Sequence, residues 1–212
     1  MSADLRVYLV TDPAYDDLES IVAAAVSGGV TCVQVRDKRP DADRVASVRR
    51  LRTVLPDDVV LIANDDVAAA REGHGLHVGL DDVDPCSARA LLGPEAVIGW
   101  SINHLSQLDD LAQLGACDYV AASPVWSTPT KTDTGVPFGL DGVRRLAERL
   151  DGRLPLVAIG GIDHSNAADV IEAGADGVAV VSAICGADDP RAAAEELRAV
   201  VDTAHRTRGR HR

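Results

Sequence analysis

The feature that most constrains the fold is a repeat of short apolar runs, each followed by a segment with helical spacing. The segment 18–26 places apolar side chains at positions i, i+3, i+4 and i+7, the stripe that packs a helix against a sheet. The segments 141–150 and 192–201 show similar spacing. The apolar runs themselves occupy residues 7–10, 32–35, 59–63, 76–79, 97–100, 119–122, 156–159 and 177–181.

This repeat predicts a (β/α)₈ TIM barrel that forms a single compact α/β domain. Eight strand–helix units in 212 residues fit a barrel near the lower size limit of the fold. A doubly wound parallel sheet is the alternative, but it usually has fewer strands. Aromatic residues make up only 3% of the chain, so Ala, Val, Leu and Ile must build the core, and these residues suit parallel strands covered by helices.

The ends of the helices and of the domain are also readable. Helices are expected to stop at the glycines within 27–29, 114–115 and 173–174, because glycine tolerates the positive φ that often closes a helix. We assign residues 1–205 to the catalytic barrel. The basic residues 206–212 are expected to form a disordered tail.

Charge and cysteine usage exclude several classes of protein. A formal net charge of −12 disfavours nucleic-acid binding, which needs a basic face to neutralise phosphates. No apolar run approaches the roughly 20 residues that cross a bilayer, and the first residues lack the features of a signal peptide. The four cysteines are widely spaced, which argues against a disulfide framework or a zinc site. We therefore expect a cytoplasmic protein with no membrane partner.

Cationic residues gather after two of the predicted strands. Gln34, Arg36 and Lys38 occupy alternate positions, so their side chains point to one side while the chain is extended. Arginine offers a planar fork for phosphate oxygens and lysine a compact charge. Lys38 and Lys131 are the only lysines among 21 cationic residues, which indicates that a small ammonium group is needed at both places.

Carboxylates follow the third and fourth predicted strands. Asp65 and Asp82 could share a hard cation, because Mg²⁺ is commonly held by one or two carboxylates together with phosphate oxygens of the substrate. Asp81 and Asp84 compete with Asp82 for the second position.

Glycines follow the seventh predicted strand, at Gly160 and Gly161. Barrels frequently bind phosphate at the loops after strands seven and eight, where glycine lets an anion approach backbone N–H groups. The segment 127–137 is rich in Thr, Pro and Gly and has no apolar period. It is expected to form a lid that closes over bound phosphate.

Taken together, these segments resemble the thiamine-phosphate synthase (thiamine-phosphate pyrophosphorylase) family from residue 8 to about residue 197. The motifs that carry the resemblance are Tyr-Leu-Val-Thr-Asp at 8–12, Val-Gln-Val-Arg-Asp-Lys at 33–38, Ala-Asn-Asp-Asp at 63–66, Gly-Leu-His-Val-Gly-Leu-Asp-Asp at 75–82, Ser-Pro-Val-Trp-Ser-Thr-Pro-Thr-Lys at 123–131, Ala-Ile-Gly-Gly-Ile at 158–162 and Gly-Val-Ala-Val-Val-Ser-Ala-Ile at 177–184.

The resemblance implies a transferase that joins hydroxymethylpyrimidine diphosphate to a thiazole phosphate, giving thiamine phosphate and pyrophosphate with Mg²⁺. The thiazole nitrogen is then the nucleophile, so the protein needs none of its own. Position by position, it places catalytic roles on Arg36, Lys38, Ser101 and Lys131. The substrate-binding set is Gln34, Arg36, Lys38, Asn64, Ser101, Thr128, Pro129, Thr130, Lys131, Gly161, Val181 and Ser182, and the metal ligands are Asp65 and Asp82.

Three positions depart from the family pattern: Leu80 replaces a common Gln, Asn103 a frequent His, and Ser123 a frequent Gly. Two rival functions stay open. A thiazole tautomerase on the same fold would need the thiazole-phosphate site but not the cations for a diphosphate. A non-catalytic binding protein of the thiamine pathway could keep phosphate contacts without the metal ligands.

Overall fold

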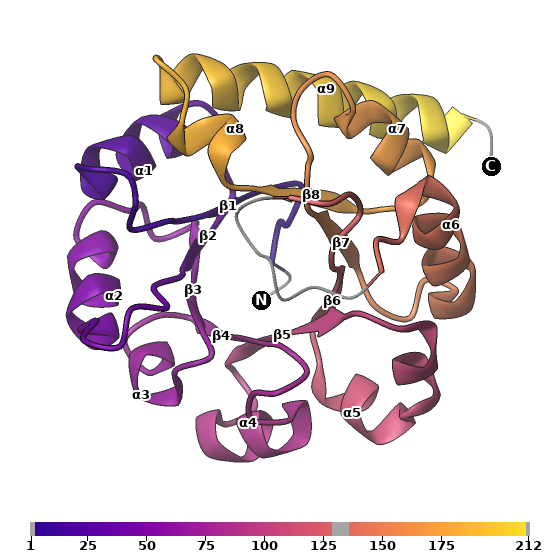
Figure 1. Ribbon diagram of the computed structural model, residues 1–212, viewed down its shortest axis with the longest axis horizontal. Coiled ribbons are helices and arrows are strands. Elements are labelled where there is room, and N and C mark those ends of the chain that lie inside the picture. The colour runs from indigo at the N-terminus through magenta and orange to yellow at the C-terminus, as the bar shows by residue number, and fades with distance from the viewer. Residues whose placement is uncertain (1–2, 129–135, 211–212) are drawn as a thin grey trace.

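A computed structural model describes residues 3–128 and 136–210 of the chain. Within these residues, eight parallel strands close into a barrel in chain order, with the last strand paired to the first (Figure 1). This confirms the predicted (β/α)₈ barrel, and closure of the sheet excludes the doubly wound alternative, which is open at both edges.

The strands lie where the apolar runs predict them. The largest difference is at the fifth strand, which continues to Ile102 and therefore contains Ser101. The strands are β1 (Val7–Val10), β2 (Cys32–Val35), β3 (Val60–Asn64), β4 (Gly75–Val78), β5 (Val97–Ile102), β6 (Tyr119–Ala122), β7 (Leu156–Ile159) and β8 (Gly177–Val180).

Helices surround the barrel, as Figure 1 shows. Glycine ends α1 as expected, but Gly115 lies inside its helix, so the predicted stop at 114–115 is wrong. The helices are α1 (Leu18–Ser27), α2 (Arg44–Arg52), α3 (Val67–Ala70), α4 (Pro85–Leu92), the 3₁₀ turn η1 (Leu105–Asp109), α5 (Leu111–Ala116), α6 (Gly139–Leu150), α7 (Ala167–Glu172), α8 (Ser182–Cys185) and α9 (Pro190–Arg210).

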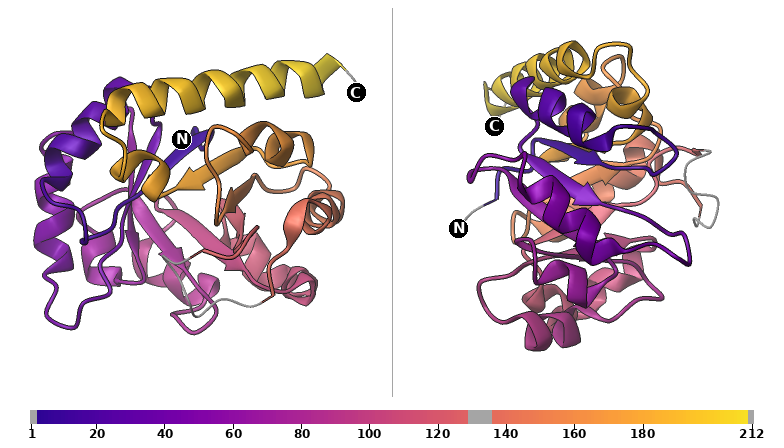
Figure 2. Two further views of the ribbon diagram at one scale, coloured as in Figure 1. Left: turned by 45° about the horizontal axis from the view of Figure 1, so that its top comes forward. Right: turned by 90° about the vertical axis from the view of Figure 1, so that its left-hand side faces the viewer.

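The C-terminal segment corrects the expectation of a disordered tail. Helix α9 continues through residue 210 and crosses the outside of the barrel against α1 and α7 (Figure 2). The Arg208 guanidinium donates hydrogen bonds to the carbonyl oxygens of Ile171 and Ala175, at 2.8 and 2.6 Å. The basic residues are thus helical up to Arg210. The Arg208 bonds hold this end of α9 against α7, since they satisfy carbonyl groups at the end of that helix and just beyond it. Residues 211–212 lie outside the described part of the chain.

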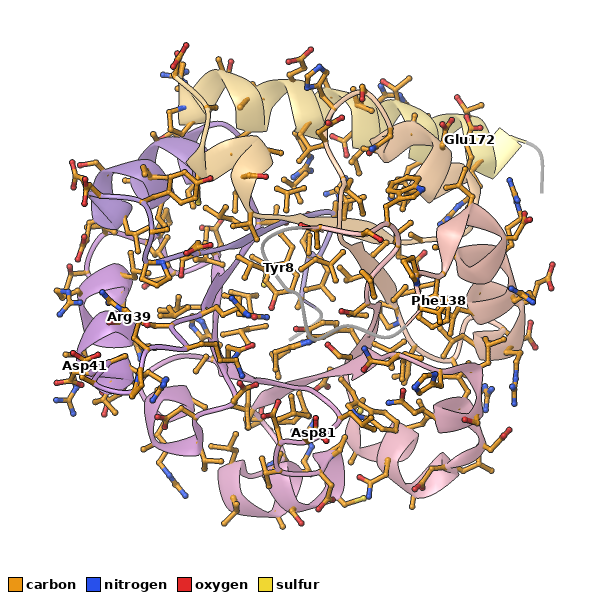
Figure 3. The ribbon with its side chains drawn as sticks, viewed as in Figure 1. Tyr8, Arg39, Asp41, Asp81, Phe138 and Glu172 are labelled. Atoms are coloured by element: carbon orange, nitrogen blue, oxygen red, sulfur yellow. The ribbon has the colours of Figure 1, made fainter. Side chains whose placement is uncertain are left out.

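The core has two layers, separated by the strands. The outer layer fills the space between strands and helices and consists mainly of Ala, Val, Leu and Ile. The inner layer fills the barrel and includes Tyr8, Cys32, Ile62 and Tyr119. Figure 3 shows Tyr8 within the ring of strands. Polar side chains therefore enter the barrel interior from several strands. Within residues 3–128 and 136–210, no helix has the length and apolar character needed to span a membrane.

Candidate active site

A cavity of about 330 Å³ lies at the carboxyl ends of the strands. In (β/α)₈ barrels this end carries the catalytic residues. Eight of the residues predicted to bind substrate line this cavity: Gln34, Arg36, Asn64, Ser101, Thr128, Gly161, Val181 and Ser182. The barrel thus gathers into one space residues in or just after strands β2, β3 and β5 and residues from the segments that follow β6, β7 and β8.

Three other predicted site residues do not line this cavity, and three more belong to a segment that the structure does not describe. Lys38, Asp65 and Asp82 follow the same strand ends but do not line the cavity. Pro129, Thr130 and Lys131 lie outside the described residues, as does most of the predicted lid.

Hydrogen bonds beyond the ends of β1 and β2 position Gln34 and Arg36. The backbone N–H of Thr11 donates to the Gln34 carbonyl at 2.9 Å, and the backbone N–H of Arg36 donates to the Thr11 hydroxyl at 3.1 Å. These bonds extend the pairing of the two strands past Val35. The Gln34 side chain, 5% exposed, is directed into the barrel, whereas Arg36 reaches its rim.

Two charged residues in the turn after β2 form ion pairs with different partners. Asp37 accepts hydrogen bonds from Arg39, which lower the pKa of its carboxyl group although burial opposes the shift. Lys38 instead pairs with Asp65 across the neighbouring loop. The lysine proposed for the diphosphate and the aspartate proposed for the metal therefore neutralise one another in the protein alone.

The two predicted metal ligands occupy loops after adjacent strands. Asp65 has a left-handed backbone, with φ of 62°, and its N–H donates to the His77 carbonyl at 3.0 Å. One Asp82 oxygen accepts from the Gly79 N–H at 2.6 Å. Asp84 caps α4, with its two oxygens bonded to the N–H and hydroxyl of Ser87, so it competes poorly for a cation.

The donor set fits Mg²⁺ only with help from a ligand. Within the described residues, no cluster of three or more His, Cys, Asp or Glu side chains could hold a metal ion. Two carboxylates from adjacent loops are what Mg²⁺ uses when substrate phosphate oxygens and water complete its shell. Asp65 and Asp82 therefore fit a cation that arrives with a diphosphate, rather than one held by the protein alone.

Two glycines shape the opposite rim of the cavity. Gly160 and Gly161 have φ angles of 110° and 69°, which favour glycine. A Cβ atom at Gly160 would lie 2.7 Å from Cβ of Pro124, so this turn also has no room for a side chain. The Asn166 amide donates to the Gly161 carbonyl at 2.9 Å and fixes the turn. Both glycines are therefore required by backbone conformation and by packing against the segment after β6.

A hydrogen-bonded chain that the sequence did not predict runs along the cavity wall, where Tyr8, Gln34, His77 and Ser101 line the cavity. Gln34 donates to the Tyr8 hydroxyl at 2.7 Å, and that hydroxyl lies 3.0 Å from the Tyr119 hydroxyl. His77 Nδ1 lies 2.9 Å from the Tyr119 hydroxyl, and His77 Nε2 lies 2.9 Å from Ser101 Oγ. We call these five residues (Gln34, Tyr8, Tyr119, His77 and Ser101) the interior network. It connects Gln34 and Ser101, both predicted to bind substrate, through the buried side chains of Tyr8, Tyr119 and His77. The sequence motifs assigned no function to these three.

A second set of bonds holds the backbone around Ser101. Gln107 donates its amide to the Ser101 carbonyl at 3.1 Å and accepts from the Asn103 N–H at 2.8 Å. The Asn103 side chain donates to the Ser123 carbonyl at 2.9 Å. Asn103 and Ser123, two of the three departures from the family pattern, are thus joined to each other, whereas Leu80 is exposed.

Comparisons with known proteins decide the family. The family model described as thiamine monophosphate synthase matches residues 7–184. The chain belongs to the thiamine monophosphate synthase family. A thiamine-phosphate synthase from Albidiferax ferrireducens is 48% identical over 205 residues, covering 93% of this chain and 92% of the relative. One from Azorhizobium caulinodans is 43% identical over 212 residues, covering 96% and 98%.

Solved structures agree with this family. The thiamine phosphate pyrophosphorylase from Pyrococcus furiosus superposes with a TM-score of 0.84 at 32% identity, covering 96% of this chain and 98% of that one. A 3-hexulose-6-phosphate synthase, at 18% identity and a TM-score of 0.69, shares the fold. As a member of the family, the chain is an enzyme of thiamine biosynthesis, of the transferase class.

Proposed function

We propose that this enzyme joins hydroxymethylpyrimidine diphosphate to thiazole phosphate, releasing pyrophosphate and forming thiamine phosphate. The observation that carries the proposal is the shared cavity. It brings Gln34, Arg36 and Asn64 to one rim and the glycine turn at 160–161, with Ser182, to another. Two phosphorylated ligands could therefore bind with their rings between the two rims.

The reaction asks the protein mainly for charge stabilisation. Breaking the carbon–oxygen bond at the pyrimidine methylene leaves negative charge on pyrophosphate and positive charge on the ring. Arg36 at the cavity rim, with Lys38 and Lys131 beside the diphosphate, would stabilise the leaving group. The apolar walls formed by Val10, Val157 and Ala179 would keep water from the cationic fragment until the thiazole nitrogen attacks.

Mg²⁺ is part of the proposal, with Asp65 and Asp82 as its ligands. The bound cation would neutralise the diphosphate. Lys38 and Asp65 pair with each other in the protein alone, so binding of the metal diphosphate would compete with this pair. Lys38 would then bind phosphate while Asp65 binds the cation. Metal and diphosphate should therefore bind more tightly together than separately.

The first experiment mixes the purified protein with both substrates and Mg²⁺ and follows thiamine phosphate by fluorescence after oxidation. Product that disappears with EDTA is expected. Arg36→Gln should lower kcat by roughly 10²- to 10³-fold, the usual loss for one charge-stabilising donor. The control Arg39→Gln alters a neighbouring arginine that is paired with Asp37 and should retain activity. A folded protein that binds thiazole phosphate but forms no product would instead favour the tautomerase or a binding protein.

The metal assignment has its own test. Asp65→Ala should abolish the Mg²⁺-dependent gain in pyrophosphate affinity, measured by isothermal titration with and without Mg²⁺. Asp66→Ala is the control, because Asp66 caps α3 through the Ala69 N–H. If the Asp65 variant binds magnesium pyrophosphate like the wild type, the cation lies elsewhere.

A further inference from the structure

The interior network has a direction that its donors and acceptors define. The Gln34 amide nitrogen can only donate, so the Tyr8 oxygen accepts from it at 2.7 Å. Tyr8 has one hydrogen left to give. The Tyr119 oxygen is 3.0 Å away, and the thiol of Cys32 also interacts with Tyr8. Sulfur is a weak acceptor, so the Tyr8 hydrogen goes to Tyr119.

The same matching of donors to acceptors fixes the hydrogen bonds from Tyr119 to the cavity. Tyr119 accepts from Tyr8 and therefore donates to the remaining partner of its hydroxyl, His77 Nδ1 at 2.9 Å. A ring nitrogen that accepts carries no hydrogen, so a neutral His77 holds its hydrogen on Nε2. His77 Nε2 then donates to Ser101 Oγ at 2.9 Å. The Ser101 hydroxyl hydrogen is left to point toward the cavity that Ser101 lines.

We propose that Tyr8 and Tyr119 are positioning residues that hold His77 as its Nε2–H tautomer and make Ser101 a hydrogen-bond donor to an anionic oxygen of the ligand. Without the network, the imidazole could take either tautomer, and in one of them the Ser101 hydrogen would be directed to His77. The ligand's identity rests on the proposed function, whereas the tautomer of His77 does not.

Burial keeps the network in this state. Tyr8 and Tyr119 are 1% and 0% exposed, and burial raises the pKa of both phenols well above its ordinary value. Both hydroxyls therefore keep the hydrogens that the network needs. Edge-on packing of the two rings, with centroids 6.1 Å apart, and stacking of His77 on Tyr119 at 5.6 Å fix the hydroxyls in place.

The direct test is nitrogen NMR of the histidines in the protein without ligand. With His77 assigned by correlation to its backbone, we expect a pyridine-type Nδ1 and a pyrrole-type Nε2. Tyr119→Phe keeps the ring but removes the donor, and it should shift His77 toward the other tautomer or a mixture. Cys32→Ala should leave the tautomer unchanged. A protonated Nδ1 in the wild-type protein would overturn the proposal.

Kinetics separate positioning from a structural role. Tyr119→Phe should lower kcat roughly tenfold, the loss expected from about one misdirected hydrogen bond, with KM for thiazole phosphate unchanged. Combined with Ser101→Ala, it should cost nothing further, because Tyr119 acts through Ser101. The matched control is Tyr15→Phe, which alters the third tyrosine of the chain, outside the network. Additive losses would contradict the proposal.

The two levels of proposal fail in different ways. If the protein makes no thiamine phosphate but His77 is the Nε2–H tautomer, the interior network stands and the proposed function falls. If the protein makes thiamine phosphate and Tyr119→Phe alters neither the tautomer nor kcat, the function stands and the network has no positioning role.

Discussion

Gly99 on β5 shows how one missing side chain makes room for the interior network. A Cβ atom at this position would lie 2.1 Å from Cζ of Tyr119 and would overlap the hydroxyl end of the ring. The residue is paired with Tyr119 across the β5–β6 ladder, so the tyrosine folds over the glycine. Glycine is required here by space and not by φ, because only a hydrogen leaves room for the phenol that contacts His77.

Gly99→Ala should therefore lower the free energy of unfolding by about 1–3 kcal/mol through overpacking, and it should reduce activity by displacing the Tyr119 hydroxyl. Gly115→Ala is the matched control. Gly115 lies in helix α5 with nothing within 4 Å of an added Cβ, so alanine there should be neutral or add up to about 1 kcal/mol. Urea unfolding of both variants tests the contrast, and equal stability of the two would refute it.

The place of a side chain in the candidate site could be predicted from the sequence only where the residue belonged to a local pattern. Gln34 and Arg36 alternate along one strand end and follow a motif, so their place at the cavity could be anticipated. Tyr8 and Tyr119 are 111 residues apart, and their contact depends on the register of strands across the whole barrel. Lys38 was predicted to serve phosphate, but its pairing with Asp65 depends on the course of two loops.

At the scale of elements, α9 illustrates how tertiary contacts extend a helix beyond its apolar pattern. The periodic stretch at 192–201 predicted the N-terminal half of the helix, whereas the basic end carries no such pattern. Arg208 stabilises that end because its guanidinium satisfies two carbonyl groups and contacts Asp176 at 2.8 Å. Its side chain is 17% exposed, so these bonds are largely shielded from water.

We expect Arg208→Ala to lower the free energy of unfolding by about 1.5–3 kcal/mol, because it leaves the Ile171 and Ala175 carbonyl groups without their charged donor. Arg206→Ala removes a charge two residues earlier on the same helix. Arg206 is exposed and bonds only locally to Thr203, so its loss should stay within about 0.5 kcal/mol. Thermal unfolding measures both, and similar losses would show that net charge, and not the Arg208 contacts, matters.

At the scale of the whole molecule, an ionic cluster joins the two ends of the chain. Arg6, just before β1, bonds to Asp4 and to Asp202 of α9, the latter at 2.9 Å. Arg198 bonds to Asp202 at 2.9 Å and to the Gly29 carbonyl at 3.2 Å. Burial acts to raise the pKa of Asp4, but the hydrogen bonds and charge of Arg6 outweigh it and lower that pKa.

This cluster should weaken in acid. Because the Asp4 pKa is lowered by folding, its contribution is present above its unfolded pKa of about 3.9 and is lost as the pH falls through the folded value. Asp4→Asn should cost less than about 1 kcal/mol at neutral pH, since the carboxylate is partly exposed. The difference from wild type should vanish in acid, as measured by urea unfolding across that range. Asp58→Asn, at an exposed surface carboxylate, is the control.

The global fold was the most predictable level. Eight apolar runs and the helices between them determine a parallel barrel almost without reference to individual contacts, because the outer layer of the core, between strands and helices, consists mainly of buried aliphatic residues. Closure itself cannot be predicted from any local segment, because it depends on the pairing of β1 with β8, at opposite ends of the barrel sequence.

Closure of the ring by β8 and its coverage by α9 have a consequence for synthesis. A ribosome synthesises the chain from N- to C-terminus, so β1 emerges before β8. One edge of β1 therefore stays unpaired until residues 177–180 of β8 have emerged. Until then the nascent sheet has two unpaired edges, which can pair with other chains. Messages or protease cuts that remove the last quarter of the protein should therefore yield aggregating fragments rather than weakened enzyme.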